Sequence, residues 1–233
     1  MTPERAATVG VILAGGLARR MGGGHKMLRS VGGESVLARL IARLKPQVGA
    51  LALNLNTDPA LFAEFALPVV PDDLPGNPGP LAGILAGLDW AAREMPSASW
   101  LVSVPGDAPF IPADLAVRLQ SERRLRGAEL ACAASAGRTH PVIGLWPLML
   151  RTALRRALVE DIRKIDRFTA RYATISVEWP AEPLDPFFNV NRPEDLAEAD
   201  RLAACKPLLS RSEREGRAEG NPDPAEPRSE DIR

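Results

Sequence analysis

The segment VGVILAGGLARRMGGGHK, residues 9–26, carries the strongest local signal in the chain. It opens with a continuous apolar run, Val9–Ala14, that is rich in β-branched residues. Such a run is typical of a strand covered on both faces in a parallel sheet. Gly15 and Gly16 end the run, and three more glycines follow at 22–24. Glycines let the backbone approach a ligand and turn its N–H groups inward, so this connection suits an anion.

The same connection holds three basic residues, Arg19, Arg20 and Lys26. Glycines and cations together suit a triphosphate, and the alternative is a surface turn with solvated basic side chains. Lys26 is followed by Met27 instead of Ser or Thr, which excludes a Walker A loop. Met27 also stands where the dinucleotide fingerprint requires Gly or Ala. The common P-loop NTPases and NAD enzymes are therefore excluded.

Outward from this loop, apolar runs that indicate strands alternate with helical patterns. Further strands are predicted over residues 50–55, 68–71, 100–104, 130–134, 142–146 and 174–179. Helices are predicted over residues 36–44, 61–65, 81–94, 112–126, 148–160, 162–172 and 193–204. This alternation indicates right-handed βαβ units, and hence an α/β fold with a mostly parallel sheet.

Composition limits the class of protein. The 233 residues include 29 Lys+Arg and 29 Asp+Glu, and this zero net charge argues against nucleic acid as a partner. Two cysteines and two histidines exclude a disulfide framework and a Cys- or His-rich metal centre. The N-terminal region has neither a signal-peptide pattern nor a membrane-spanning run, so we expect a cytoplasmic protein without a membrane partner. We expect one domain over residues 1–206 and a disordered, charged tail over residues 207–233.

Ligands of open parallel sheets bind at the carboxyl ends of the strands, where polar residues end several apolar runs. Asp107 follows a buried strand and suits Mg²⁺, or it belongs to the approach of the next helix. Asp72, next to Asp73, is a candidate of the same kind, although Asp before Leu-Pro-Gly is also ordinary turn chemistry. The amide of Asn54 suits a base edge or a ribose hydroxyl, or it closes a turn.

Asn189 and Asn191 alternate with Val190, so the two amides share one face of an extended segment. They either contact a substrate or position a metal-bound phosphate, or Asn191 caps the helix that starts at Pro193. The remaining candidates have structural interpretations: Asp114 as a helix cap, His140 in a polar turn over residues 135–140, and Cys132 in the core.

The string LAGG-x-x-x-RMG-x-x-x-K, residues 13–26, resembles the signature loop of nucleotidyltransferases that activate small phosphorylated molecules with an NTP. The chain is most similar to the molybdenum cofactor guanylyltransferase (MobA) family. Four later blocks occur in that family's order, and the resemblance covers about residues 8–204. The blocks are PGPLAG (78–83), PGDAPFIP (105–112), HPVIGLW (140–146) and FNVNRPEDL (188–196).

The resemblance implies a three-layer Rossmann-like fold with helices on both sides of the sheet. It assigns the nucleotide to backbone groups of Leu13, Ala14 and Gly15 and to the side chains of Lys26, Asn54, Asp72 and Asp107. Asp107 is also the implied magnesium ligand. The position before the lysine, usually acidic in the family, is His25 here, which leaves the role of that side chain open.

The implied reaction transfers GMP from GTP to molybdopterin or Mo-molybdopterin, releases pyrophosphate and uses Mg²⁺. The attacking phosphate is already an anion, so catalysis needs positioning and charge neutralisation, from Lys26, Asp107 and Arg20, with Arg19 as the alternative arginine. Asn189 and Asn191 would bind molybdopterin. The sequence leaves two alternative functions open. The chain could be a cytidylyltransferase or another small-phosphate nucleotidyltransferase, or it could be a non-catalytic module that binds GTP or molybdopterin. It also leaves open molybdoenzyme-maturation proteins as partners.

Overall fold

The computed structural model describes residues 2–14, 25–74 and 79–204. The tail predicted over residues 207–233 lies outside the described residues and stays a prediction. The helices are α1 (Pro3–Ala6), α2 (Val36–Leu44), α3 (Pro80–Glu94), α4 (Leu115–Leu125), α5 (Arg151–Val159), α6 (Ile165–Thr169) and a last helix over 193–204. Short 3₁₀ turns are η2 (Lys26–Leu28), η3 (Lys45–Gln47), η4 (Pro59–Phe65) and η5 (Leu148–Leu150).

The strands form one large sheet in the order β5-β4-β1-β6-β8-β7-β9 and a small β2-β3 hairpin. Their bounds are β1 (Thr8–Leu13), β2 (Ser30–Val31), β3 (Glu34–Ser35), β4 (Ala50–Asn54), β5 (Val69–Val70), β6 (Trp100–Pro105), β7 (Leu130–Ser135), β8 (Arg138–Pro147) and β9 (Thr174–Trp179). In the large sheet only β8 runs antiparallel to its neighbours, β6 and β7. The prediction of a mostly parallel sheet is confirmed.

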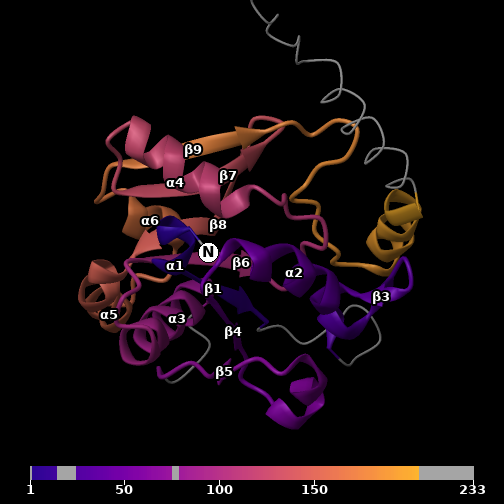
Figure 1. The fold of residues 1–233 in the computed structure, drawn as a ribbon, viewed down its shortest axis with the longest axis horizontal. Coiled ribbons are helices and arrows are strands. Elements are labelled where there is room, and N and C mark those ends of the chain that lie inside the picture. Colours follow the sequence, from indigo (N-terminus) through magenta and orange to yellow (C-terminus); the bar gives the residue numbers. More distant parts are fainter. Residues whose placement is uncertain (1, 15–24, 75–78, 205–233) are drawn as a thin grey trace, which may run out of the picture.

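The large sheet is covered on both faces, which is why all six residues of β1 are buried. One apolar cluster joins the sheet to α2, α4 and the helix over 193–204. A second cluster joins the opposite face to α3, α5 and α6. Figure 1 shows α3 and α5 side by side, away from α4. The structure therefore has the three layers that the family resemblance implies.

Strand register brings the polar strand ends together. Leu13, the last residue of β1, pairs with Asn54 at the end of β4 and with Pro105 at the end of β6. The strand order also reverses here, because β4 lies on one side of β1 and β6 on the other. Such a reversal point is where open α/β sheets form a crevice for ligands at their carboxyl edge.

Two predicted boundaries are wrong in an informative way. Helix α4 begins at Leu115, so Pro112 precedes the helix and does not lie in its first turn. Strand β8 begins at Arg138, so His140 lies in a strand and not in a turn. The actual turn is the pair Ala136 and Gly137, whose φ angles of 49° and 71° fit a tight hairpin. Alanine is rare at positive φ, so the sequence gives little signal for this turn.

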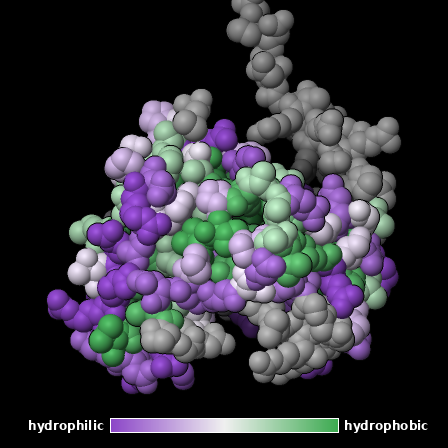
Figure 2. All heavy atoms as spheres, turned by 90° about the horizontal axis from the view of Figure 1, so that it is seen from below, coloured by the Kyte–Doolittle hydropathy of each residue, from purple (hydrophilic) through white to green (hydrophobic). Residues whose placement is uncertain are grey.

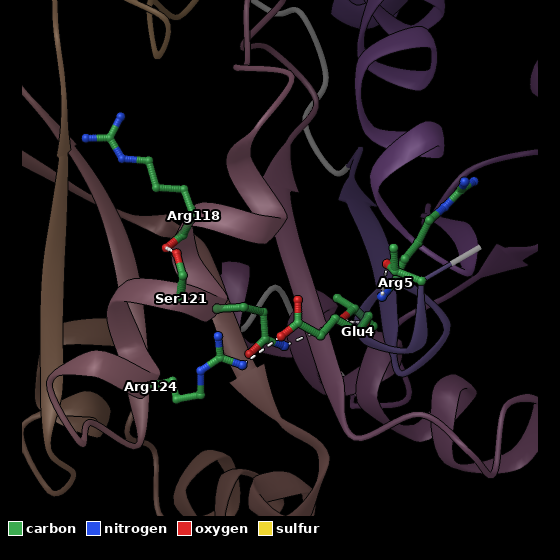
Figure 3. Close-up of polar contacts among 8 residues, drawn as sticks. Glu4, Arg5, Arg118, Ser121 and Arg124 are labelled. Carbon is green, nitrogen blue, oxygen red and sulfur yellow. Dashed lines mark hydrogen bonds and ion pairs between the residues drawn. The ribbon is translucent and has the colours of Figure 1, made fainter. Parts of the chain in front are cut away.

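At the opposite edge of the sheet, where the parallel strands begin, polar side chains connect α1 and β1 to α4. Glu4 of α1 forms a 2.7 Å ion pair with Arg124 of α4, and Figure 3 shows the two side chains pointing toward one another. The hydroxyl of Thr8, the first residue of β1, accepts a hydrogen bond from Gln120 of α4 at 3.3 Å. These contacts hold α1 and the start of β1 against α4, at the edge that lies away from the carboxyl ends of the strands.

The surface carries mixed polarity. Seen from below, hydrophilic residues surround an apolar area (Figure 2). The exposed large apolar side chains belong to η4, α4, η5 and α5, so they come from separate elements; they are Leu61, Val117, Leu125, Met149 and Val159. Within the described residues, no helix is both long and apolar enough to cross a bilayer.

Candidate active site

Lys26 lies at the centre of the polar residues that meet at the carboxyl edge. Its Nζ donates a 2.8 Å hydrogen bond to Asp107 Oδ2, at the end of β6, and a second one to Asn191 Oδ1. The Lys26 and Asp107 side chains are only 15% and 25% exposed, so their ion pair is weakly screened by water. Three residues that the sequence singled out separately are therefore in direct contact.

Within the part of the chain that the structure describes, only one of the two carboxylate oxygens of Asp107 is hydrogen-bonded. Oδ2 accepts from Lys26, whereas Oδ1 is buried and has no hydrogen-bond partner within the described residues. The backbone carbonyl of Asp107 accepts from the N–H of Val190, and α4 starts eight residues later, so Asp107 does not cap that helix. A buried, unpaired carboxylate oxygen is costly without a cation or donor, and it fits a divalent metal.

No described group of three or more His, Cys, Asp or Glu side chains is arranged to hold a metal ion. A resident, fully protein-coordinated metal is therefore not built into the described residues. Mg²⁺ often uses only one or two protein carboxylates and takes its other ligands from phosphates and water. Asp107 alone is compatible with that mode of binding.

Asn54 and Asp72 meet at the ends of β4 and β5. Asn54 is 4% exposed, and its Nδ2 donates to Val70 O and to Asp72 Oδ1, both at 2.9 Å. Asn56, which was not among the predicted site residues, donates to Asp72 Oδ2 and accepts from the Asp72 N–H. The sequence signal for Asn56 is its i+2 spacing from Asn54, the same spacing that drew attention to Asn189 and Asn191.

Two glycines allow the close packing beneath this edge. A Cβ on Gly83 of α3 would lie 2.3 Å from Asn54 Oδ1 and 2.8 Å from Leu13 Cδ2. A Cβ on Gly106 would lie 2.9 Å from Met27 Cε. Any other residue at position 83 would displace the Asn54 side chain, which gives the final glycine of PGPLAG a physical role.

Backbone hydrogen bonds connect the end of β1 and the first residue after it to the neighbouring strand ends. The Ala14 N–H donates to Asn54 O, and the Leu13 carbonyl accepts from the Gly106 N–H, each at 2.9 Å. A nucleotide contact from Ala14 would therefore use its carbonyl. Gly15, Arg19 and Arg20 lie outside the described residues, so their predicted contacts stay predictions.

Asn189 and Asn191 are both exposed at this edge. The Asn191 side chain accepts from Lys26, and the helix over 193–204 is capped instead by Asp195, whose Oδ2 accepts from the N–H groups of Asn191 and Arg192. The cap is thus made by Asp195, and the contact of Asn189 and Asn191 with a ligand stays a prediction.

The side chains of the remaining candidates contact other parts of the protein. His25 packs edge-on against Phe62 of η4, with ring centroids 5.2 Å apart. Asp73 forms a 3.0 Å ion pair with Arg155 of α5. Asp114 occupies the N-cap position of α4, but its carboxylate accepts from Trp179 Nε1 and makes no capping bond. Cys132 is partly buried beside Ser176, and burial raises the pKa of its thiol.

Comparison with known proteins identifies the family of this chain. The MobA-like NTP transferase domain family matches residues 10–175. A molybdenum cofactor guanylyltransferase from Rhodopseudomonas palustris is 61% identical over 201 residues, which cover 86% of this chain and 96% of the relative. The chain belongs to the molybdenum cofactor guanylyltransferase family.

Solved structures with low sequence identity share the fold of this chain. Molybdopterin-guanine dinucleotide biosynthesis protein A from Archaeoglobus fulgidus superposes with a TM-score of 0.68 at 23% identity, covering 84% of this chain and 98% of that one. A Mycobacterium tuberculosis protein solved in complex with manganese has a TM-score of 0.58 at 17% identity, with coverage of 84% and 98%. At these identities the likeness establishes the guanylyltransferase fold and not the details of the site.

Proposed function

We propose that this chain transfers GMP from GTP to molybdopterin, or to its molybdenum-loaded form, and releases pyrophosphate. The observation that carries the proposal is the contact of Lys26 with both Asp107 and Asn191, in a chain 61% identical to a molybdenum cofactor guanylyltransferase. In the reaction, an oxygen of the terminal molybdopterin phosphate bonds to the α-phosphorus of GTP. The bond from that phosphorus to the bridging oxygen breaks, and pyrophosphate leaves with the electron pair.

The main barrier to this reaction is the repulsion between two anions. The attacking phosphate oxygen needs no strong base, because it is already deprotonated at neutral pH. The chain must instead hold the two substrates in line and neutralise their charge. Lys26 is suited to this because its ammonium group contacts both the carboxylate of Asp107, after β6, and the amide of Asn191.

We assign the divalent cation, Mg²⁺, to Asp107. The support is the unpaired, buried Oδ1 atom and the preference of Mg²⁺ for one or two carboxylates plus substrate phosphates. When bound, the cation would offset the negative charge of the phosphates. Asp107 would orient it, while Lys26 would move its hydrogen bonds from the carboxylate toward phosphate oxygens.

The nucleotide is assigned to the β1–β4–β5 side and molybdopterin to the β6 side. Asn54, Asn56 and Asp72 form a linked polar group at the ends of β4 and β5, suited to hydroxyl or base-edge contacts. Leu13, Ala14, Gly15 and Arg20 complete this side in the proposal. Asn189 and Asn191 are assigned to the acceptor, with its phosphate next to Lys26.

A nucleotide panel tests the proposal. Purified protein would be mixed with molybdopterin, Mg²⁺ and either GTP, CTP, ATP or UTP, and the dinucleotide product and pyrophosphate would be measured. We expect pyrophosphate and a guanine dinucleotide with GTP. A stronger product with CTP would reassign the chain to cytidylyl transfer, and binding of GTP without pyrophosphate release would make it a carrier.

A further inference from the structure

Three polar side chains form a cluster beside the active site, at the same edge of the sheet. Ser135 ends β7, His140 lies near the start of β8, and Asp185 follows β9. Ser135 Oγ lies 2.8 Å from His140 Nε2 and 2.8 Å from Asp185 Oδ1. Ser135 is 1% exposed, one of the few buried polar side chains of the described residues.

The order of the bonds excludes a nucleophilic role. Ser135 donates its proton directly to Asp185, so its oxygen accepts from the Nε2–H of His140. In a hydrolytic triad the histidine lies between the serine and the carboxylate and acts as the base. Here the serine is in the middle and is buried, so both its donor and its acceptor capacity are used inside the protein.

The cluster holds the start of segment 185–191. Asp185 Oδ1 also accepts from the N–H of Phe187 at 2.9 Å. The Phe187 ring is 2% exposed and packs against the His140 ring, with centroids 5.0 Å apart, and edge-on against Trp179 at 5.4 Å. Burial lowers the pKa of His140, which keeps the imidazole neutral beside this aromatic ring.

The other end of the same segment is held by the active site. Val190 is fully buried, and its N–H donates to the carbonyl of Asp107 at 2.9 Å. The next residue, Asn191, accepts from Lys26. Segment 185–191 is thus fixed at both ends. The cluster holds its first residues, Lys26 and Asp107 hold its last residues, and the exposed Asn189 lies between them.

We propose that Ser135, His140 and Asp185 are positioning residues for the acceptor substrate, because together they fix the segment that presents Asn189 and Asn191. This inference rests on the proposed function for the identity of the acceptor. The three side chains do not touch the reacting atoms. They restrict the segment before molybdopterin binds, and such preorganisation lowers the ordering cost of binding.

Asp185→Ala and Asp185→Asn test the proposal. Alanine removes the acceptor for both Ser135 and Phe187, whereas asparagine keeps a carbonyl oxygen at that position. We expect Asp185→Ala to raise the KM for molybdopterin about tenfold and to change the KM for GTP less than about twofold, because it removes the charged acceptor that orders the acceptor-binding segment. Asp185→Asn should recover most of the affinity. The peptide covering residues 185–191 should exchange its amide hydrogens faster in Asp185→Ala.

Glu129→Ala is the matched control. The Glu129 carboxylate accepts from a backbone N–H, that of Ala173, at 2.9 Å, but at the amino edge of the sheet. The Glu129→Ala variant should leave the KM for molybdopterin, the KM for GTP and the amide hydrogen exchange of residues 185–191 unchanged. If Asp185→Ala gives wild-type exchange and KM for molybdopterin, or raises both KM values equally, the positioning role is wrong.

The two proposals fail separately. A wild-type protein that makes no dinucleotide from molybdopterin overturns the proposed function. Hydrogen exchange needs no substrate, so it still reports whether the cluster fixes segment 185–191.

Discussion

At the scale of single residues, Lys26 joins segments that are far apart in the sequence. Its ammonium group is bonded to a carboxylate and to an amide that lie 81 and 165 residues further along the chain. Lys26 and Asp107 balance each other's charge while both are largely shielded from water. When phosphates enter the crevice, the same ammonium can stabilise their charge without a change in backbone conformation, which is the benefit of a preorganised cation.

Lys26→Met is expected to reduce kcat/KM for GMP transfer about 10²–10³-fold, because it removes one preorganised charge partner from the transition state. Methionine keeps an unbranched side chain that is only one atom shorter, so circular dichroism should show unchanged secondary structure. Lys45→Met, at an exposed lysine just after α2, is the matched control and should retain activity. A Lys26→Met protein with wild-type turnover would remove Lys26 from the mechanism.

Asp107→Asn should weaken binding of the divalent cation together with turnover. The change preserves the shape of the side chain but removes the charge on the buried Oδ1 atom. We expect Mn²⁺ titration in the presence of GTP, followed by electron paramagnetic resonance, to show weaker binding, and the rate to fall about 10²–10³-fold. Asp166→Asn, at an exposed carboxylate of α6, is the control. Unchanged Mn²⁺ affinity in Asp107→Asn would contradict the metal assignment.

At the scale of elements, continuous apolar runs predicted β1, β4, β6 and β7 well, because strands buried on both faces leave an unambiguous pattern. The edge strand β9 was also predicted, although only Val177 and Trp179 of its residues are buried. The start of β8 could not be predicted in this way. Its first residues, Arg138–His140, are polar, and they are held in the sheet by pairing with Ala133–Ser135 of β7 rather than by burial. The start of α4 was also missed, because proline is compatible both with a first helical turn and with the loop before it.

The contact of α3 with β4 can be tested at Gly83. Gly83→Ala places a Cβ 2.3 Å from Asn54 Oδ1, so the Asn54 side chain must shift, and the shift disturbs its hydrogen bond to Asp72. We expect a loss of stability of roughly 1–3 kcal/mol from overpacking, together with a higher KM for GTP. Urea unfolding and steady-state kinetics measure the two effects.

Gly87→Ala provides the comparison on the same helix. Its Cβ would meet Val11 at 3.0 Å, in the interior of the sheet and away from Asn54. It should reduce stability but leave the KM for GTP near the wild-type value. Equal changes in the KM for GTP in both variants would mean that Gly83 has no particular relation to the nucleotide side.

At the scale of the whole molecule, the sheet register predicts where the site lies but not which residues touch. The sequence indicated Asn54, Asp72, Asp107 and Asn191 because they end apolar runs, and Lys26 because it is a cation in the glycine-rich connection after the first strand. The aligned ends of β1, β4 and β6 bring this part of the chain to one edge of the sheet. The bond from Lys26 to Asn191 and the Ser135–His140–Asp185 cluster depend on how chain segments far apart in the sequence pack over that edge. No local pattern carries that information, so these contacts needed the structure.

The pH dependence of stability should reveal the buried cluster. Burial lowers the pKa of His140 from its ordinary value of 6.5; the charges of Asp185 and Glu178 oppose this effect, and that of Arg138 adds to it. Below pH 6.5 the unfolded chain therefore binds a proton at His140 that the folded protein does not bind. The free energy of unfolding should fall as the pH decreases through 6.5 and level off below the folded pKa. In His140→Gln this contribution is absent. Urea unfolding at pH 7.5 and 5.5 should accordingly show a larger loss of stability for the wild type than for His140→Gln, and equal losses would mean that His140 has the same pKa in both states.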